Sequence, residues 1–391
     1  MTTASDIVIV SARRTAMGGF QGDLRDTTAP ELGAAALKAA VDDAQLSADD
    51  VEQVVMGCVL PAGLGQAPAR QAALKAGLDL STACVTLNKM CGSGMKAVMD
   101  AHDALKAGSA AIIAAGGMES MTNAPYLLPK ARSGYRMGHG RVMDHMFLDG
   151  LEDAYEPGRA MGTFAEECAK SYQFTRAAQD DYALESLSRA KSAIASGAFE
   201  REITGVSTRA GDVTVDEQPG KARPDKIPNL KPAFAADGTV TAANASSISD
   251  GAAALVLMKR ETAQARGLVP LATILGHSVH AQAPALFTTA PVPAIGRLME
   301  RLGWTVEGTD LFEVNEAFAV VTMAAMHELG IAHSKMNVNG GATALGHPIG
   351  ASGARILVTL IHALQARGGG TGVAALCIGG GEATAVAVQV G

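Results

Sequence analysis

The stretch CGSGMK at residues 91–96 opens a segment that ends in the apolar run IIAAGGME at residues 112–119, and the chain repeats this design once. In the repeat, GASGAR at residues 350–355 opens a segment that ends in LCIGGGE at residues 376–382. Both segments have the pattern of a Gly/Ser turn, a long helix, a Gly-rich loop and a buried strand closed by glycines. Two copies of one such unit predict a duplicated α/β domain.

The helix expected in each unit carries apolar residues at helical spacing. They are Met95, Val98, Met99 and Leu105 in the first unit, and Ile356, Leu357, Leu360, Ile361 and Leu364 in the second. A short apolar strand is expected before each turn, at residues 84–87 and 336–338. The shared element order predicts that the two turns face one cleft.

Different material separates the two halves. Residues 120–247 hold all five tyrosines and the basic stretch KARPDK at residues 221–226, which periodicity cannot assign to any element. One helix is expected there, at residues 175–195, with Thr175 as its N-cap and Gly197 just past its end. We therefore predict an N-terminal half at residues 1–119 and 248–269, an inserted loop domain at 120–247 that covers a site, and a C-terminal half at 270–391.

Composition excludes several classes of protein. Of the 391 residues, 48% are hydrophobic and 18% charged, which allows a large core and argues against a disordered chain. The net charge of −7 argues against an unassisted nucleic-acid surface and against a polybasic membrane anchor. The 44 glycines imply many tight turns and close backbone approaches. This is the composition of an acidic α/β enzyme.

Cysteine usage and the chain start bear on localisation. The five cysteines lack CxxC spacing, so neither a disulfide framework nor a thiolate zinc site is expected, and no other metal site is predicted. The N-terminus runs directly into the strand-like residues 7–10, and no apolar run reaches the ~18 residues of a membrane span. We therefore expect a cytoplasmic protein.

Cys91 is the first candidate for chemistry, because it lies between a predicted strand and the N-terminus of a long helix. Unpaired backbone N–H groups and the positive end of the helix dipole favour thiolate over thiol at such a position. A free cysteine is more commonly a small buried hydrophobe, and the residue by itself leaves both interpretations open.

Three further candidates lie in the second half. His347 lies in the Gly-rich loop 340–350. Pro348 and the glycines fix the conformation of this loop, so the imidazole is held in place. Cys377 lies inside an apolar strand, for which a core role is the simpler interpretation. Asn315 and Glu316 lie between apolar runs and need hydrogen-bond partners if they are buried. A cysteine combined with a histidine and an asparagine is a general arrangement for nucleophilic catalysis.

Taken together, four motifs resemble the signatures of the thiolase family in order and spacing. They are CGSG at 91–94, NEAF at 315–318, GGATALGHPIGASGAR at 340–355 and CIGGGEA at 377–383. The resemblance extends from residue 8 to the end of the chain. It implies a thiolase fold of the α/β class, with duplicated five-stranded mixed sheets between helices in a five-layer αβαβα arrangement and an inserted loop domain.

The resemblance also implies roles for individual residues. Cys91 matches the nucleophile that takes the acyl group as a thioester, and His347 matches the histidine that activates it. Cys377 matches the acid/base that acts on the α-carbon of the second acetyl group. Asn315 matches the residue that holds a water in one oxyanion hole, and the backbone N–H groups of Cys91 and Gly379 match the second hole.

Coenzyme A contacts are implied in the same way. Phe234 and Ser246 match positions that contact pantetheine and adenine, and Met161 and Phe318 match pocket residues. Lys221 and Arg223 are candidates for the phosphates, because an acidic protein needs local cations to bind an anionic carrier. For these two residues an ordinary solvated loop remains the alternative.

Two departures concern the acyl pocket. Acetoacetyl-specific thiolases usually have a histidine directly before the Met-Gly of the loop domain, and this chain has Ala160 there. Near the acyl end, where such enzymes tend to have methionine, the alignment gives Phe287. The segments GYRMG at 134–138 and VMDHM at 142–146 still resemble the covering and tetramerisation loop of acetoacetyl-CoA thiolases.

The function implied is that of an acyltransferase, acetyl-CoA C-acetyltransferase, which condenses two acetyl-CoA to acetoacetyl-CoA plus CoA. A 3-ketoacyl-CoA thiolase of broader chain length in β-oxidation is the alternative, and a non-catalytic acyl-CoA-binding or lipid-transfer protein is a third possibility. Ketoacyl synthases lack a second catalytic cysteine, so Cys377 argues against them. We expect acetyl-CoA and 3-ketoacyl-CoA as partners, a homotetramer, no cofactor, no nucleic acid and no membrane.

Overall fold

The two predicted units form the centre of the fold. In the computed structural model, which describes residues 3–391, the first unit comprises β4 (Ala83–Leu87), α3 (Ser93–Ala107) and β5 (Ile112–Ser120). The second contains α11 (Ser352–Ala366) and β14 (Gly370–Ile378). The apolar residues expected on one face of each helix are buried. The duplicated α/β design is therefore confirmed.

The first half has the expected five-stranded mixed sheet, in the order β1-β11-β5-β3-β4. Besides β4 and β5 it contains β1 (Ile7–Thr15), β3 (Gln53–Gly57) and β11 (Ser249–Lys259). β11 pairs antiparallel with both β1 and β5, so the chain does return to the first half after the insert.

The sheet of the second half has the order β13-β14-β15-β12 and is one strand shorter than predicted. Its further strands are β12 (Ala272–Ala281), β13 (Leu311–Val314) and β15 (Glu382–Val390). The prediction of a strand at 336–338 is wrong, because this segment forms only a single β-bridge, between Phe312 and Met336. Asn337 has φ +44° and uses its side-chain amide, at 2.8 Å, to bond both the N–H and the carbonyl of Val314. A side chain thus replaces the backbone pairing of a fifth strand.

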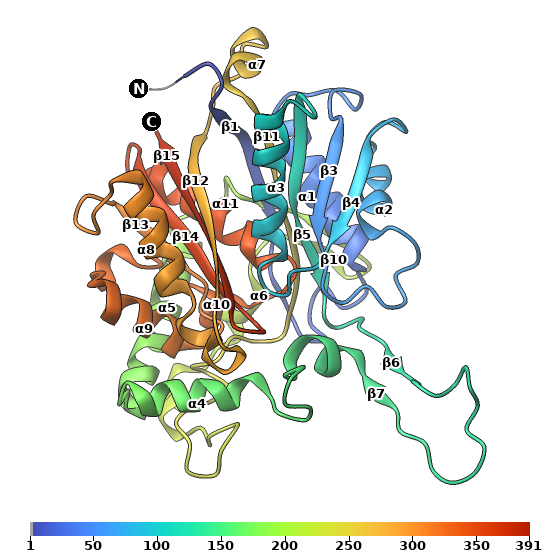
Figure 1. The fold of residues 1–391 in the computed structure, drawn as a ribbon, viewed down its shortest axis with the longest axis vertical. Coiled ribbons are helices and arrows are strands. Elements are labelled where there is room, and N and C mark those ends of the chain that lie inside the picture. The colour runs from blue at the N-terminus through green and yellow to red at the C-terminus, as the bar shows by residue number, and fades with distance from the viewer. Residues whose placement is uncertain (1–2) are drawn as a thin grey trace.

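Helices enclose the two sheets in five layers (Figure 1). α1 (Ala29–Asp43) and α2 (Pro68–Lys75) cover the outer face of the first sheet, and α8 (Pro291–Leu302) and α9 (Ala319–Leu329) cover the second. α3 and α11 pack against each other between the sheets. At one edge β1 pairs briefly with β12, through Val8–Thr273 and Ile9–Ala272, which joins the two sheets along one path.

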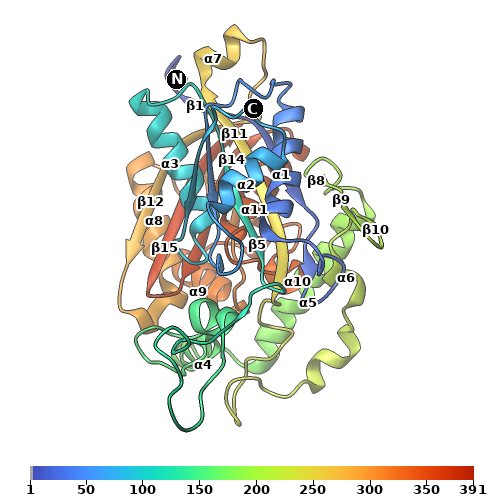
Figure 2. The same ribbon diagram turned by 90° about the vertical axis from the view of Figure 1, so that its right-hand side faces the viewer.

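The inserted segment runs from the lower end of the molecule, where its residues around α4 (Met161–Ser171) lie, up one side to the short strands β8, β9 and β10 at residues 203–213 (Figure 2). The predicted helix is α5 (Arg176–Ala195), and the Thr175 hydroxyl caps it by accepting from the Ala178 N–H at 3.1 Å. A second helix, α4, was not predicted. The hairpin of β6 (Tyr126–Leu127) and β7 (Met143–Asp144) projects away from the body in both views.

The remaining elements are short. In the inserted segment they are η1 (Phe147–Leu151), β8 (Ile203–Thr204), β9 (Val206–Thr208), β10 (Gly211–Val213), α6 (Glu217–Lys221) and η2 (Pro224–Asn229). Elsewhere they are β2 (Gly18–Gly19), α7 (Arg260–Ala265), η3 (Pro284–Thr289), η4 (His333–Lys335) and α10 (Ala342–Leu345). Among residues 3–391, no helix has the length and apolar character needed to cross a bilayer.

Candidate active site

The N-terminal turns of the two central helices pack against each other through glycine. A Cβ on Gly94 would lie 2.8 Å from the backbone nitrogen of Ala354, and a Cβ on Gly353 would lie 2.4 Å from that of Met95. Such distances are shorter than real Cβ contacts, so both positions require glycine. This reciprocal contact brings the turn that carries Cys91 to the loop that carries His347.

A cavity of about 840 Å³ lies where these turns meet the inserted segment. Cys91, His347, Cys377 and Gly379 all line it. Of the predicted coenzyme A contacts, those on the cavity wall are Met161, Phe234, Ser246, Phe287 and Phe318. Ala160, the departure noted in the sequence, lines the same wall. The structure therefore gathers residues from all three parts of the chain around one space.

Cys91 follows β4 and precedes Gly92, the N-cap of α3. Burial raises the pKa of the Cys91 thiol to about 11, although the N–H groups of Gly379 and of Cys91 itself donate toward the sulfur. The expectation of a stabilised thiolate is thus wrong for the free protein, because desolvation outweighs the helix N-terminus. Cys91 needs a base to react at neutral pH.

His347 lines the same cavity as Cys91 and is held as a neutral ring. It is 6% exposed, and burial, assisted by the charge of Arg355, lowers its pKa to about 3, so the ring is neutral at pH 7. Its Nδ1 lies 2.6 Å from the Ser352 hydroxyl, which donates to the Pro348 carbonyl at 2.9 Å. Since the single hydroxyl proton goes to that carbonyl, Nδ1 carries the imidazole proton and Nε2 is left unprotonated and basic.

Asn315 and Cys377 flank this pair. Asn315 directly follows β13, is fully buried, and places its amide nitrogen 3.5 Å from both ring nitrogens of His347. Its Oδ1 has no hydrogen-bond partner among the described residues. Cys377, in β14, is 1% exposed, and burial followed by the proximity of Cys91 raises its thiol pKa well above the usual value.

Two buried carboxylates hold the loops around these residues. Glu316 accepts five hydrogen bonds, from Tyr182, Ser186, Asn337 and, twice, Thr343. Its bonds to Thr343 fix the loop that leads to His347. The sequence indicated that Glu316 needs partners but gave it no role.

Glu119 was missed altogether. Its carboxylate accepts from the N–H groups of Val59 and Leu60 in the first half and of Gly350 in the second, at 2.9–3.1 Å. Burial raises its pKa to about 7 despite these bonds. The signal available in the sequence was a carboxylate placed at the end of an apolar strand.

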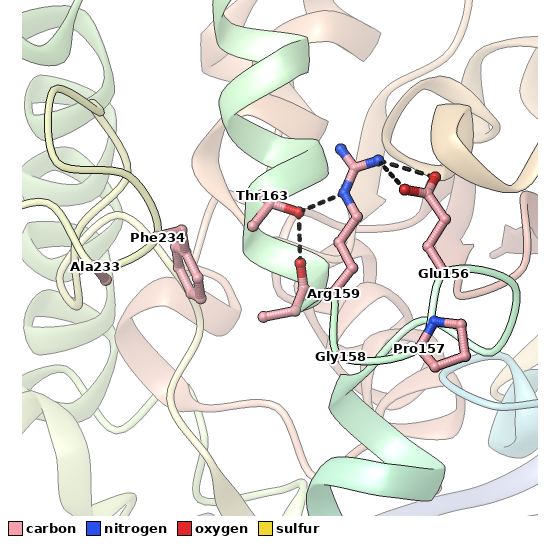
Figure 3. Close-up of a pocket in the computed structure, with 8 residues that line it drawn as sticks. Glu156, Pro157, Gly158, Arg159, Thr163, Ala233 and Phe234 are labelled. Carbon is pink, nitrogen blue, oxygen red and sulfur yellow. Dashed lines mark hydrogen bonds and ion pairs between the residues drawn. The ribbon is translucent and has the colours of Figure 1, made fainter.

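The two predicted phosphate contacts do not line the cavity. Lys221 forms ion pairs with Glu217 and, at 3.5 Å, with Asp23. Arg223 is exposed just before η2. A shallower pocket beside Phe234 contains Arg159 instead, and Figure 3 shows its guanidinium bonded to Glu156 and to the Thr163 hydroxyl.

Comparison with known proteins identifies the class. The family model described as thiolase, N-terminal domain, matches residues 7–261, and the thiolase C-terminal domain model matches residues 268–390. The chain therefore belongs to the thiolase family.

Individual relatives are close over their whole length. An acetyl-CoA acetyltransferase of Escherichia coli is 51% identical, with 98% of each chain covered. One of Cupriavidus necator is 49% identical over 98% of this chain and 99% of its own. The crystal structure of Acat5 thiolase from Ascaris suum in complex with coenzyme A has a TM-score of 0.95 and 43% identity, with 98% of this chain and 100% of that chain covered.

The burial of neutral His347 predicts a specific loss of stability in acid. A histidine with a pKa of about 3 when folded and ~6.5 when unfolded is protonated first in the unfolded chain, so stability falls as the pH drops below 6.5. Between pH 7 and 5 this costs about 2 kcal/mol. In urea unfolding, His347→Gln should lose about 2 kcal/mol less than wild type over that interval.

The exposed His327 provides the control for this measurement. His327→Gln should keep the wild-type pH dependence. The raised carboxyl pKa values of Glu119 and Glu313 act in the opposite direction but are common to all three proteins. Equal slopes for wild type and His347→Gln would contradict the assignment of a neutral buried imidazole.

Proposed function

We propose that this thiolase condenses two molecules of acetyl-CoA into acetoacetyl-CoA and free coenzyme A through an acyl-Cys91 intermediate. The observation that carries the proposal is the convergence of Cys91, His347 and Cys377 on one cavity. The acetyl-CoA acetyltransferases of E. coli and C. necator, about half identical over the full length, support the substrate. A coupled assay that detects acetoacetyl-CoA and released coenzyme A in equal amounts tests it, and binding without release would indicate a non-catalytic carrier.

The acylation step uses His347 and Cys91. Nε2 of His347 takes the Cys91 proton, the sulfur attacks the thioester carbonyl, and the C–S bond to coenzyme A breaks. The N–H groups of Cys91 and Gly379 already converge on that sulfur, so they are close to the oxygen of the acyl group that forms there. The departing coenzyme A thiolate takes a proton from Cys377.

The condensation step then uses Cys377 as the base. Its thiolate removes an α-proton from the second acetyl-CoA, and the carbanion attacks the acyl carbon on Cys91. The unpartnered Oδ1 of buried Asn315 supports a role in holding a water that, with His347, donates to the enolate oxygen. When the new C–C bond forms, the Cys91 sulfur leaves and recovers its proton from His347.

Acyl chain length separates this proposal from the alternative of a broad-range 3-ketoacyl-CoA thiolase. The small side chain of Ala160 leaves space at the cavity wall, whereas the ring of Phe287 occupies space there. This ring packs edge to face against Phe164, with the ring centroids 6.1 Å apart. A methylene that fits gains ~0.8 kcal/mol and one that clashes loses more. We expect kcat/KM for thiolysis to be highest at four carbons and to fall steeply by eight.

Two variants sharpen the chain-length test. Phe287→Ala should relax the fall between four and eight carbons, and Ala160→His should steepen it. Thiolysis of 3-ketoacyl-CoA substrates of four to ten carbons measures both effects. A flat or rising wild-type profile would identify the broad-range enzyme.

We also propose assembly into a homotetramer in a reducing, cytoplasmic environment. Four apolar side chains of the projecting hairpin, Tyr126, Leu128, Met137 and Val142, are 53–98% exposed. A group of exposed apolar side chains of this kind is typical of a surface that contacts another subunit. All five cysteines are free thiols, and the reaction depends on two of them. No cofactor is required by the steps above, since coenzyme A thioesters are substrates.

A further inference from the structure

Two histidines and an aspartate meet outside the catalytic cavity. His102 and Asp103 lie on the later turns of α3, and His277 lies in the middle of β12. Nδ1 of His102 and Nε2 of His277 are each 2.9 Å from the same oxygen, Oδ1 of Asp103. The two rings pack edge to face, with centroids 5.2 Å apart. Sequence spacing could not reveal this group, because 174 positions separate His277 from Asp103.

The geometry of this cluster suits a small divalent ion. Its three ligand atoms all lie within 4.8 Å of one another. Tetrahedral zinc with bonds of 2.0–2.2 Å holds its ligand atoms roughly 3.3 Å apart. The two nitrogen-to-oxygen distances of 2.9 Å therefore need to lengthen by only a few tenths of an ångström, and the two nitrogens already lie within 4.8 Å of each other. The side chain of Asp103 is 59% exposed, which leaves solvent access for the ion and for a water as fourth ligand.

One positive charge lies near this cluster. The nearby ammonium of Lys106 opposes a cation, and it is directed to the Ser5 carbonyl at 2.8 Å.

We propose that His102, Asp103 and His277 bind one transition-metal ion, and that Zn²⁺ is best matched to two imidazoles and a carboxylate. None of the three residues lines the catalytic cavity. The ion would connect α3, which begins two residues after Cys91, to the first strand of the second half. It stabilises the contact between the halves and takes no part in acyl transfer.

Zinc titration against a chromophoric chelator tests the site. Wild type should bind one Zn²⁺ per chain, and His102→Asn and His277→Asn should each weaken binding at least about tenfold. His327→Asn, which replaces an exposed histidine elsewhere, is the matched control and should bind as wild type does. Zinc should raise the melting temperature of wild type and control but not of the two variants.

Cobalt distinguishes this site from the catalytic cysteines. Co²⁺ bound by two imidazoles and a carboxylate gives visible absorption without thiolate-to-cobalt charge transfer. Asp103→Asn supplies a third test if either histidine variant fails to fold. Equal zinc affinity in all variants, or a charge-transfer band lost in Cys91→Ala, would overturn the proposal. Thiolase activity in metal-free buffer should be the same in wild type and His102→Asn.

Discussion

Replacement of Cys91 by alanine should lower kcat by on the order of 10⁶-fold, the scale seen when the nucleophile of an acyl-transfer enzyme is removed. The fold should survive, because Cys91 is only partly buried and alanine leaves the Gly94–Gly353 contact untouched. Steady-state condensation and thiolysis assays, with circular dichroism of the same samples, measure both outcomes. Loss of less than about tenfold would remove Cys91 from the mechanism.

Chemical labelling tests independently whether Cys91 is the nucleophile. Iodoacetamide should modify Cys91 once per chain, and acetyl-CoA should protect it. Because burial raises the Cys91 pKa to about 11, the labelling rate should still be rising at pH 9. Cys84 is the other partly buried thiol, so Cys84→Ser is the matched control and should label as wild type does. Inactivation that follows labelling at Cys84 would contradict the proposal.

Replacement of Cys377 by alanine should separate the two chemical steps. Some acyl transfer from acetyl-CoA to Cys91 should remain, although Cys377 no longer protonates the departing coenzyme A. By contrast, α-proton exchange and condensation should fall by about 10²–10⁴-fold, the usual contribution of a positioned base. Deuterium uptake into the acetyl group, compared with acylation followed by intact mass, measures the division. The buried Cys168, also a free thiol but not on the cavity wall, provides Cys168→Ala as control.

An equal loss of acylation and exchange in Cys377→Ala would contradict this division of labour. It would indicate instead that Cys377 shapes the cavity around Cys91. The raised pKa of Cys377 is consistent with the base role, because a thiol that ionises reluctantly gives a strong base once it has surrendered its proton.

The sequence predicts the duplicated fold well, because helix faces and glycine turns are local patterns. Even the missed helix α4 carried such a pattern, with Phe164, Ala165, Cys168 and Ala169 buried at helical spacing. The strand expected at 336–338 failed for a different reason. Asn337 bonds Val314 through its side chain, and that partner lies 23 residues away. No local pattern distinguishes such a contact from strand pairing.

For the candidate site, the sequence predicted which residues come together but not their protonation states. Four motifs were enough to select the residues that converge on the cavity, but not their ionisation. A helix N-terminus is visible in sequence, whereas the burial that raises the pKa of Cys91 to about 11 depends on the whole fold. Likewise, Lys221 is a cation in the sequence, yet in the structure Glu217 and Asp23 engage it. A sequence shows how many charged residues a chain has, but not which of them form ion pairs with one another.

The glycine contact between α3 and α11 has a consequence for how this enzyme can diversify. The reacting groups stand on two backbones fixed by main-chain contact at Gly94 and Gly353, where any side chain would force the turns apart. The cavity wall, in contrast, is made by side chains such as Ala160 and Phe287, which can change without moving those turns. Single substitutions can therefore change the substrate range. A change at Gly94 or Gly353 would instead displace both turns that carry the reacting groups.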